Sequence, residues 1–228
     1  MPALLAALTI ALEVAYPLTH GTGRDRLTVA TVLVFLAASA AHAVRHQGAR
    51  WAAGFFLLVA GPALLVEVVG VRTGVPFGTY SYSGGLGPSV WGVPVVVPLA
   101  WAMFAYPALV VGRLLGRPWL AGAWALASWD LFLDPQMVAA GHWHFAQAGV
   151  PVTNYLGWLL VALVLVGLVT RLPWRDAPAG TPVALFLWTW LGSTLANAAF
   201  FGRPATALTG FLGMGIVGLP LVRRLQCG

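Results

Sequence analysis

The sequence predicts an all-α, polytopic integral membrane protein, a helical bundle of about eight transmembrane helices (or seven) in a single domain over residues 1–228. Two observations predict this fold class. Hydrophobic residues make up 60% of the chain and charged residues only 8%, whereas a soluble protein carries about 25% charged residues. The apolar residues also form long runs separated by short connections. Lipid is therefore the expected solvent of this chain.

The apolar runs between charged residues give the expected helices in chain order. They cover residues 3–19, 27–44, 52–70, 91–112, 119–139, 153–170, 181–200 and 204–222. Each run has roughly the 17–25 residues that a membrane-spanning helix needs. Because the connections are short, neighbouring helices are expected to pack antiparallel.

The arginines predict the orientation of the bundle, since all 12 basic residues are arginine. The side formed by the second, fourth and sixth connections and the C-terminal tail carries eight of them, namely Arg45, Arg50, Arg113, Arg117, Arg171, Arg175, Arg223 and Arg224. The opposite side carries Arg24, Arg26, Arg72 and Arg203. The positive-inside rule then places both termini on the cytoplasmic side of the cell membrane. The net charge of +6 follows from this bias and predicts no nucleic-acid partner.

Missing residue types exclude several functions. The chain has no lysine, which excludes retinal Schiff-base photoreceptors, pyridoxal chemistry and a lysine nucleophile. The lone cysteine, Cys227, is next to the C-terminus, so thiol catalysis, disulfides and cysteine-bound clusters are not expected. His142 and His144 have no nearby acid at metal-site spacing, and no metal site is predicted.

Two connections on the outer side differ from the others. Residues 71–90 are rich in Gly, Tyr, Ser and Pro, and residues 140–152 contain two histidines and a tryptophan without a formal charge. Irregular backbone at membrane depth must be covered by protein or line a cavity. Both connections are therefore candidates to dip into the bundle and form the mouth of a site. The alternative is that they are ordinary surface turns.

Four of the six acidic residues lie inside expected spans: Glu13, Glu67, Asp130 and Asp134. A carboxylate near the bilayer centre costs about 2.5–3.5 kcal/mol on insertion scales, so each one is a candidate functional residue. Glu67 is either a partner acid for the site or a residue of the membrane rim. Glu13 shares a helix face with Tyr16 and His20, a polar stripe that is equally compatible with a structural role.

Asp130 and Asp134 are four residues apart, which places both carboxyl groups on one face of a helix. Two carboxylates so close in a low dielectric do not both ionise easily, so one is expected to keep its proton. Such a pair combines a proton donor with a base. Pro135 is expected to weaken the helix at this point and open a small polar pocket. The alternative is a structural pair held by Arg, Tyr or backbone groups.

Several tryptophans lie near these acids and connections in the sequence: Trp91, Trp101, Trp129, Trp143 and Trp158. Aromatic faces stabilise cations, and a carbocation formed on an alkene needs such walls beside an acid. The alternative is simple packing. Two further polar stripes, Asn154 with Trp158 and Trp190 with Ser193 and Asn197, are either ligands or contacts between helices.

These residues carry a resemblance to a known family. The stretches are EVVG at 67–70, TGVPFGTYSY at 73–82, LGP at 86–88, GVP at 92–94, PLAW at 98–101, WDLFLDPQMV at 129–138, Gly141, Trp143, GVP at 149–151 and NYLGW at 154–158. In this order they resemble the membrane carotenoid hydratases of the γ-carotene 1′-hydratase and bisanhydrobacterioruberin hydratase type. The similarity is close over about residues 60–160 and extends to the flanking helices only through their hydropathy.

The resemblance implies addition of water across the terminal C1=C2 double bond of an acyclic carotenoid end group, without a redox cofactor or metal. The implied partners are an acyclic or monocyclic carotenoid (lycopene, γ-carotene or a C50 precursor), water, and the membrane lipid from which the polyene enters. An acid protonates C2, and water captures the tertiary cation at C1.

We assign roles to the residues on this basis. Asp134 is expected to donate the proton, Asp130 to share or tune it, and Glu67 to position or deprotonate the water. Aromatic residues are expected to wall the cation and bind the substrate, and Asn154 to orient the water. The aromatic set is Tyr80, Tyr82, Trp101, Trp129, Trp143 and Trp158.

Three other functions stay open from the sequence. A small membrane lycopene cyclase protonates the same end group but lets an internal double bond capture the cation. A carotenoid-binding or transport protein would bind without turnover. Intramembrane acids also suit a proton-coupled transporter, although no inverted repeat favours one.

Overall fold

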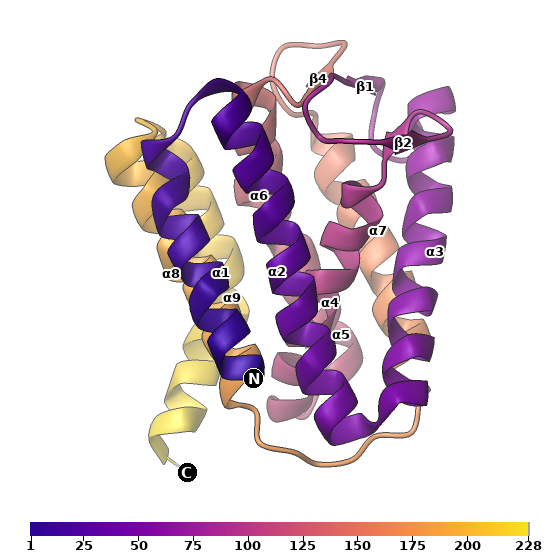
Figure 1. Cartoon of the computed structure of the whole chain (residues 1–228), viewed down its shortest axis with the longest axis vertical. Coiled ribbons are helices and arrows are strands. Elements are labelled where there is room, and N and C mark those ends of the chain that lie inside the picture. Colours follow the sequence, from indigo (N-terminus) through magenta and orange to yellow (C-terminus); the bar gives the residue numbers. More distant parts are fainter. Residues whose placement is uncertain (228) are drawn as a thin grey trace.

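The computed structural model describes residues 1–227 and confirms an all-α, polytopic membrane bundle (Figure 1). The α-helices are α1 (Pro2–Ala15), α2 (Gly21–Gln47), α3 (Ala49–Thr73), α4 (Val96–Leu114), α5 (Pro118–Ser128), α6 (Asp130–Ala140), α7 (Val152–Val169), α8 (Gly180–Leu195) and α9 (Pro204–Cys227). Short elements are the 3-10 turn η1 (Tyr16–Leu18), the π-helical turn η2 (Ala196–Phe200) and the strands β1 (Tyr80–Tyr82), β2 (Ser89–Val90), β3 (Val93–Pro94) and β4 (Trp143–Phe145).

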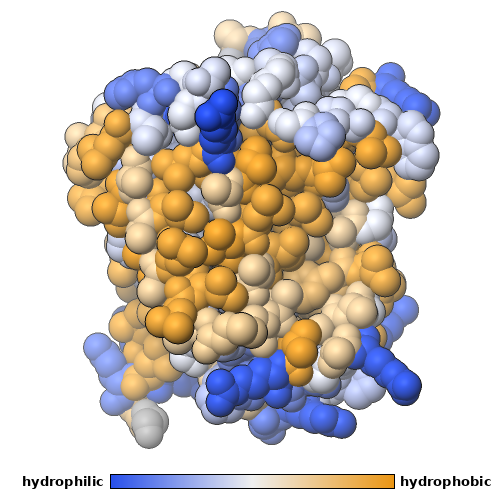
Figure 2. All heavy atoms as spheres, in the orientation of Figure 1, coloured by the Kyte–Doolittle hydropathy of each residue, from blue (hydrophilic) through white to orange (hydrophobic). Residues whose placement is uncertain are grey.

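The helices run up and down between two polar ends. Within residues 1–227, six helical segments are long and apolar enough to cross a membrane. The shorter apolar segment over residues 2–18 and the α5–α6 pair complete the expected order of spans. Both chain ends lie at the same end of the bundle (Figure 1). On the face shown in Figure 2, an apolar belt covers the middle of the molecule, with polar residues above and below it, as expected of a protein in contact with lipid.

Helix α4 is the centre of the bundle and packs against α2, α3, α5 and α8. Most of its side chains are buried, among them Trp101 and Tyr106. It approaches α5 closely at Gly112, where a Cβ atom would lie 2.7 Å from the backbone nitrogen of Gly122. Glycine at this crossing lets the two backbones come together, as small residues do in membrane helix pairs.

Three local expectations differ from the structure. The helix expected from residue 91 begins at Val96, because β3 pairs with β2 just before it. The predicted span 119–139 is interrupted at Trp129, between α5 and α6, and Pro135 lies within α6. The interruption thus precedes Pro135, and Asp130 is the first residue of α6. Asp25, which lies between the expected helices 3–19 and 27–44, belongs to the first turns of α2.

Candidate active site

The two unusual connections pair with each other across the loop end of the bundle. Strand β1 from the first is antiparallel to β4 from the second, and Tyr82 lies opposite Trp143. Because side chains alternate along a strand, Tyr80, Tyr82, Trp143 and Phe145 line the pocket beneath. The intervening Ser81 bonds His144 at 3.0 Å on the exposed side. The two connections therefore form a lid, as expected for the mouth of a site.

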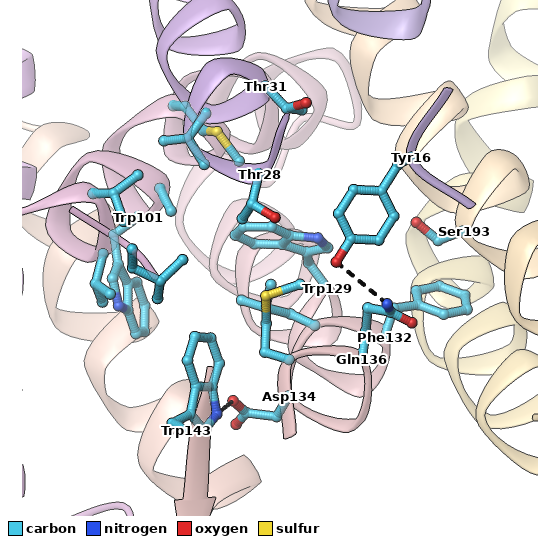
Figure 3. A pocket seen from close by; sticks show the side chains of 18 of the residues that line it. Tyr16, Thr28, Thr31, Trp101, Trp129, Phe132, Asp134, Gln136, Trp143 and Ser193 are labelled. Atoms are coloured by element: carbon cyan, nitrogen blue, oxygen red, sulfur yellow. Dashed lines mark hydrogen bonds between the residues drawn. The ribbon is translucent and has the colours of Figure 1, made fainter. Parts of the chain in front are cut away.

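Beneath this lid lies a mostly apolar pocket of about 210 Å³ (Figure 3). Its walls come from the lid and from helices on opposite sides of the bundle, with Trp101 on α4, Asp134 on α6 and Asn154 on α7. A concave, apolar cavity with a few convergent polar groups is the usual form of a small-molecule site.

Glu67 on α3 is buried and receives hydrogen bonds from the lid and from α4. Its Oε2 accepts from the hydroxyls of Tyr80 at 2.6 Å and Tyr82 at 2.7 Å, and its Oε1 accepts from Trp101 Nε1 at 3.0 Å. Burial, followed by the neighbouring Glu67 carboxylate, raises the pKa of Tyr80 and of Tyr82 above the ordinary value of a phenol. Both tyrosines therefore stay protonated and act as donors, and their bonds favour the charged form of Glu67.

Asp130 and Asp134 project from α6 toward α7, where a single amide joins them. Asn154 Nδ2 donates to Asp130 Oδ2 at 2.7 Å and also to Asp134 Oδ2. The second oxygen of Asp134 accepts from Trp143 Nε1 at 2.8 Å, which ties this acid to the lid (Figure 3). Asp130 is fully buried, and no protein group within residues 1–227 bonds its Oδ1. The two carboxyl groups thus share the amide of Asn154 as a donor.

Aromatic rings form much of the remaining wall. Trp158 stacks on Trp101 with ring centroids 3.7 Å apart, and Trp129 meets Trp158 edge to face at 6.0 Å. Trp91 is the exception among the tryptophans expected here, since it is 62% exposed on the connection before α4 and is not part of the pocket wall.

The structure brings nearly all the predicted site residues together. Those that line the pocket are Glu67, Tyr80, Tyr82, Trp101, Trp129, Asp134, Trp143, Asn154 and Trp158. Asp130 lies behind Asp134 and reaches the pocket through Asn154. Tyr80, Tyr82, Trp101 and Trp143 were expected as walls, but each also donates a hydrogen bond to an acid.

Other residues that line the pocket were not predicted from the sequence. Phe77 and Phe145 come from the lid, and Phe132 and Met137 from α6. Phe145 could have been found from its two-residue spacing to Trp143, the period of a strand, whereas the other three have no signal beyond hydrophobicity. Glu13, Ser193 and Asn197 also line the pocket, away from the acids described above.

The two loop histidines have different surroundings. His142 is buried, with its Nε2 atom 3.9 Å from Asp25 Oδ1. Burial lowers the pKa of His142, and Asp25 opposes this effect. His144 is exposed and bonds Ser81, so the two side chains face different environments.

Comparison with known proteins identifies the family of this chain. Residues 27–217 match the family described as carotenoid biosynthesis protein. The chain belongs to the carotenoid biosynthesis protein family. The bisanhydrobacterioruberin hydratase of Haloarcula japonica is 35% identical in an alignment of 204 positions, which covers 72% of this chain and 66% of that protein. The chain described here thus spans slightly less than two thirds of the length of the curated relative that it matches. No solved structure matches the chain.

Proposed function

We propose that this protein hydrates the terminal C1=C2 double bond of an acyclic carotenoid end group, as a cofactor-independent hydro-lyase. One observation carries the proposal: Asp134 and Glu67 line the same apolar, aromatic-walled pocket. An alkene has no charged group to hold, so a site for it needs apolar walls, and its hydration needs a proton donor and a proton acceptor. The relative named as a bisanhydrobacterioruberin hydratase supports the same chemistry.

The proton donor in this proposal is Asp134. Two ionised carboxylates around one amide repel each other in a buried site, so the pair with Asp130 holds one proton. Asp134 is the member that lines the pocket. It protonates C2, which forms a C–H bond and leaves a tertiary cation at C1. Trp143 Nε1, at 2.8 Å, stabilises the carboxylate that remains.

The cation forms between aromatic faces. Trp101, Trp129 and Trp158 line the pocket as a connected group of rings. Aromatic quadrupoles stabilise a nearby cation by about 0.5–2 kcal/mol each, with the larger values in desolvated sites. The walls also exclude bulk water, so that only a held water molecule competes with loss of the proton.

Water then adds to C1, and Glu67 accepts its proton. The C–O bond forms as one O–H bond of the water breaks, and the product is a tertiary alcohol. The proton gained by Glu67 returns to Asp134 before the next turnover, so the acid is not consumed. Three hydrogen bonds favour the charged form of Glu67, which is the form that accepts a proton. Asn154 uses its NH₂ group on the acid pair, which leaves its carbonyl oxygen to orient the water.

The substrate and membrane placement follow from the same reasoning. The substrate is an acyclic or monocyclic carotenoid that enters from the lipid, such as lycopene, γ-carotene or a C50 precursor. The protein lies in the cell membrane with both termini in the cytoplasm, because eight of its 12 arginines belong to that side. The lid is then on the opposite, outer side.

Production of the protein in a lycopene-making bacterium tests the proposal. Pigments are separated by chromatography, and their molecular masses are measured by mass spectrometry. A product heavier than lycopene by one or two waters is expected, and the number of waters reports how many ends react. A product of unchanged mass but altered absorption contradicts hydration and indicates a cyclase. Unchanged pigments with each of lycopene, γ-carotene and a C50 precursor indicate a binding or transport protein.

A further inference from the structure

A second polar group lines the same pocket, away from Asp134 and Glu67. It consists of Glu13 on α1, Thr31 on α2, Ser193 on α8 and Asn197 on η2, which we call the second polar group. In Figure 3, Ser193 and Tyr16 lie on one side of the pocket, and Trp101 and Trp143 lie on the other. The proposed reaction at the acids makes no use of these four residues.

Asn197 is the clearest sign that this group has a ligand. Its side chain is 2% exposed, and its Nδ2 donates to the backbone oxygen of Ser193 at 2.9 Å. Its Oδ1 and the hydroxyl of Thr31 are buried, and no protein group in the described part of the chain bonds either atom. A buried polar atom without a partner costs about 1–3 kcal/mol. Asn197 also lies in the π-helical turn η2, a local form that is frequent at functional sites.

Glu13 adds a carboxyl group to this side of the pocket. Its helix, α1, is otherwise almost entirely apolar, so the carboxyl group needs a polar environment at membrane depth. Together with the hydroxyls of Thr31 and Ser193 and the carbonyl of Asn197, it offers one cavity polar partners from α1, α2, α8 and η2. A buried water molecule needs about two to four such partners.

A chain of polar residues connects this side of the pocket with the loop end of the bundle. Gln136, two residues after Asp134 on α6, accepts from Arg203 Nη1 at 2.6 Å and donates to the Tyr16 hydroxyl at 3.4 Å. Arg203 and Arg24 both pack against the ring of Phe201, at 5.4 Å and 5.8 Å. Tyr16, Gln136 and Phe201 themselves line the pocket. The hydrogen bonds of Arg203, Gln136 and Tyr16 thus form a polar connection from the loop end of the bundle to the pocket wall.

We propose that the second polar group is a water-binding site, filled from the loop end past Tyr16 and Gln136, and that it supplies the water consumed at C1. The statement that this water is consumed at C1 rests on the proposed hydration, whereas the statement that the second polar group binds water does not. The acids at Asp134 and Glu67 carry out the chemistry, and Glu13, Thr31, Ser193 and Asn197 hold the second substrate. The polyene approaches through lipid, so the two substrates reach the pocket by separate routes.

Thiol labelling tests whether this side of the pocket is wet, independently of activity. The single cysteine is removed by Cys227→Ser, and Ser193→Cys or Thr189→Cys is added to that protein. Thr189 is the control for a dry position one turn earlier on α8, since it is more buried than Ser193, bonds its own helix and is not part of the pocket wall. A small cationic methanethiosulfonate reacts with a thiol in water. We expect it to modify Ser193→Cys at least about tenfold faster than Thr189→Cys, because only a hydrated thiol ionises. Equal rates overturn the proposal.

Turnover tests whether the water is used. The double variant Thr31→Val with Asn197→Leu removes the two unpaired polar atoms without adding charge. We expect kcat to fall about tenfold or more with little change in KM for the carotenoid. A gel-filtration profile shows whether the double variant is folded, and the single variant Thr31→Val is measured in its place if it is not. Thr194→Val is the control, since its hydroxyl bonds only its own helix and is not part of the pocket wall.

The outcomes separate this inference from the proposed function. Fast labelling with wild-type turnover in the folded double variant overturns the supply of water by this site. Fast labelling of Ser193→Cys in a protein that hydrates no carotenoid supports the water site and removes the proposed function. Loss of turnover together with slowed labelling of Ser193→Cys in the double variant supports both.

Discussion

Replacement of Trp143 by phenylalanine tests how the lid controls the proposed acid. Trp143→Phe keeps an aromatic ring in the wall and removes the indole N–H that lies 2.8 Å from Asp134 Oδ1. This bond strengthens as Asp134 loses its proton, since hydrogen bonds to charged groups contribute about 1.5–3 kcal/mol and those to neutral groups about 0.5–1.5 kcal/mol. The lost difference is about 1–2 kcal/mol in the transition state, which corresponds to roughly a 5- to 30-fold decrease in kcat.

The assay compares initial rates of lycopene hydration by purified variants in lipid nanodiscs. Trp158→Phe is the control, because Trp158 stacks on Trp101 and is also part of the pocket wall, while its indole N–H has no acid partner among residues 1–227. We expect less than about a threefold change in kcat for this control, since it loses only part of one aromatic contact. A Trp143→Phe variant within twofold of wild type, or a Trp158→Phe variant that is slowed equally, refutes the role given to the indole N–H.

Three further predictions follow from other contacts. Asn154→Leu leaves Asp130 and Asp134 without their shared donor, and we expect loss of hydration together with a stability decrease of about 1–3 kcal/mol, measured by unfolding in detergent; unchanged stability contradicts the shared bond. Glu67→Gln keeps the shape but removes the proton acceptor, so we expect kcat to fall by about 100-fold or more while the carotenoid still co-purifies; wild-type turnover excludes the assigned role. Gly112→Ala places a Cβ 2.7 Å from a backbone nitrogen of α5, whereas Gly61→Ala meets open space. We expect about 1–3 kcal/mol of destabilisation for the first and none for the second, and equal melting temperatures argue against the close packing of α4 on α5.

The helices and the acids could be predicted from the sequence because each has a large physical signal. Lipid requires long apolar runs, and a carboxyl group such as Glu67 or Asp134 is too costly at membrane depth to lack a polar environment. The spacing of Asp130 and Asp134 placed both on one side of α6, and the structure joins them through Asn154. The break at Trp129 was not predicted, since the sequence signal for a weakened helix was Pro135, and that residue stays within α6.

The pairing of the lid could not be predicted from either connection alone. Ser81 and His144, the middle residues of the two strands, are 63 residues apart along the chain, and a three-residue alternation is too short to identify its partner strand. The pairing places Tyr82 and Trp143 over the acids, to which both donate hydrogen bonds. Because the pairing could not be predicted, these residues were expected only as aromatic walls. The same is true of the second polar group, because Ser193 and Asn197 formed a visible stripe on α8 and η2, but only tertiary packing brings Glu13 and Thr31 to it.

The incorporation of oxygen from water tests the central claim most directly. Purified wild-type protein and the Asp134→Asn variant are each incubated with lycopene in water enriched in oxygen-18, and the masses of the pigments are measured by mass spectrometry. The wild type is expected to yield a tertiary alcohol with one heavy oxygen per hydrated end. The Asp134→Asn variant is expected to return lycopene unchanged while remaining folded and pigment-bound. Wild-type product without heavy oxygen, or labelled product formed at the wild-type rate by Asp134→Asn, contradicts the account.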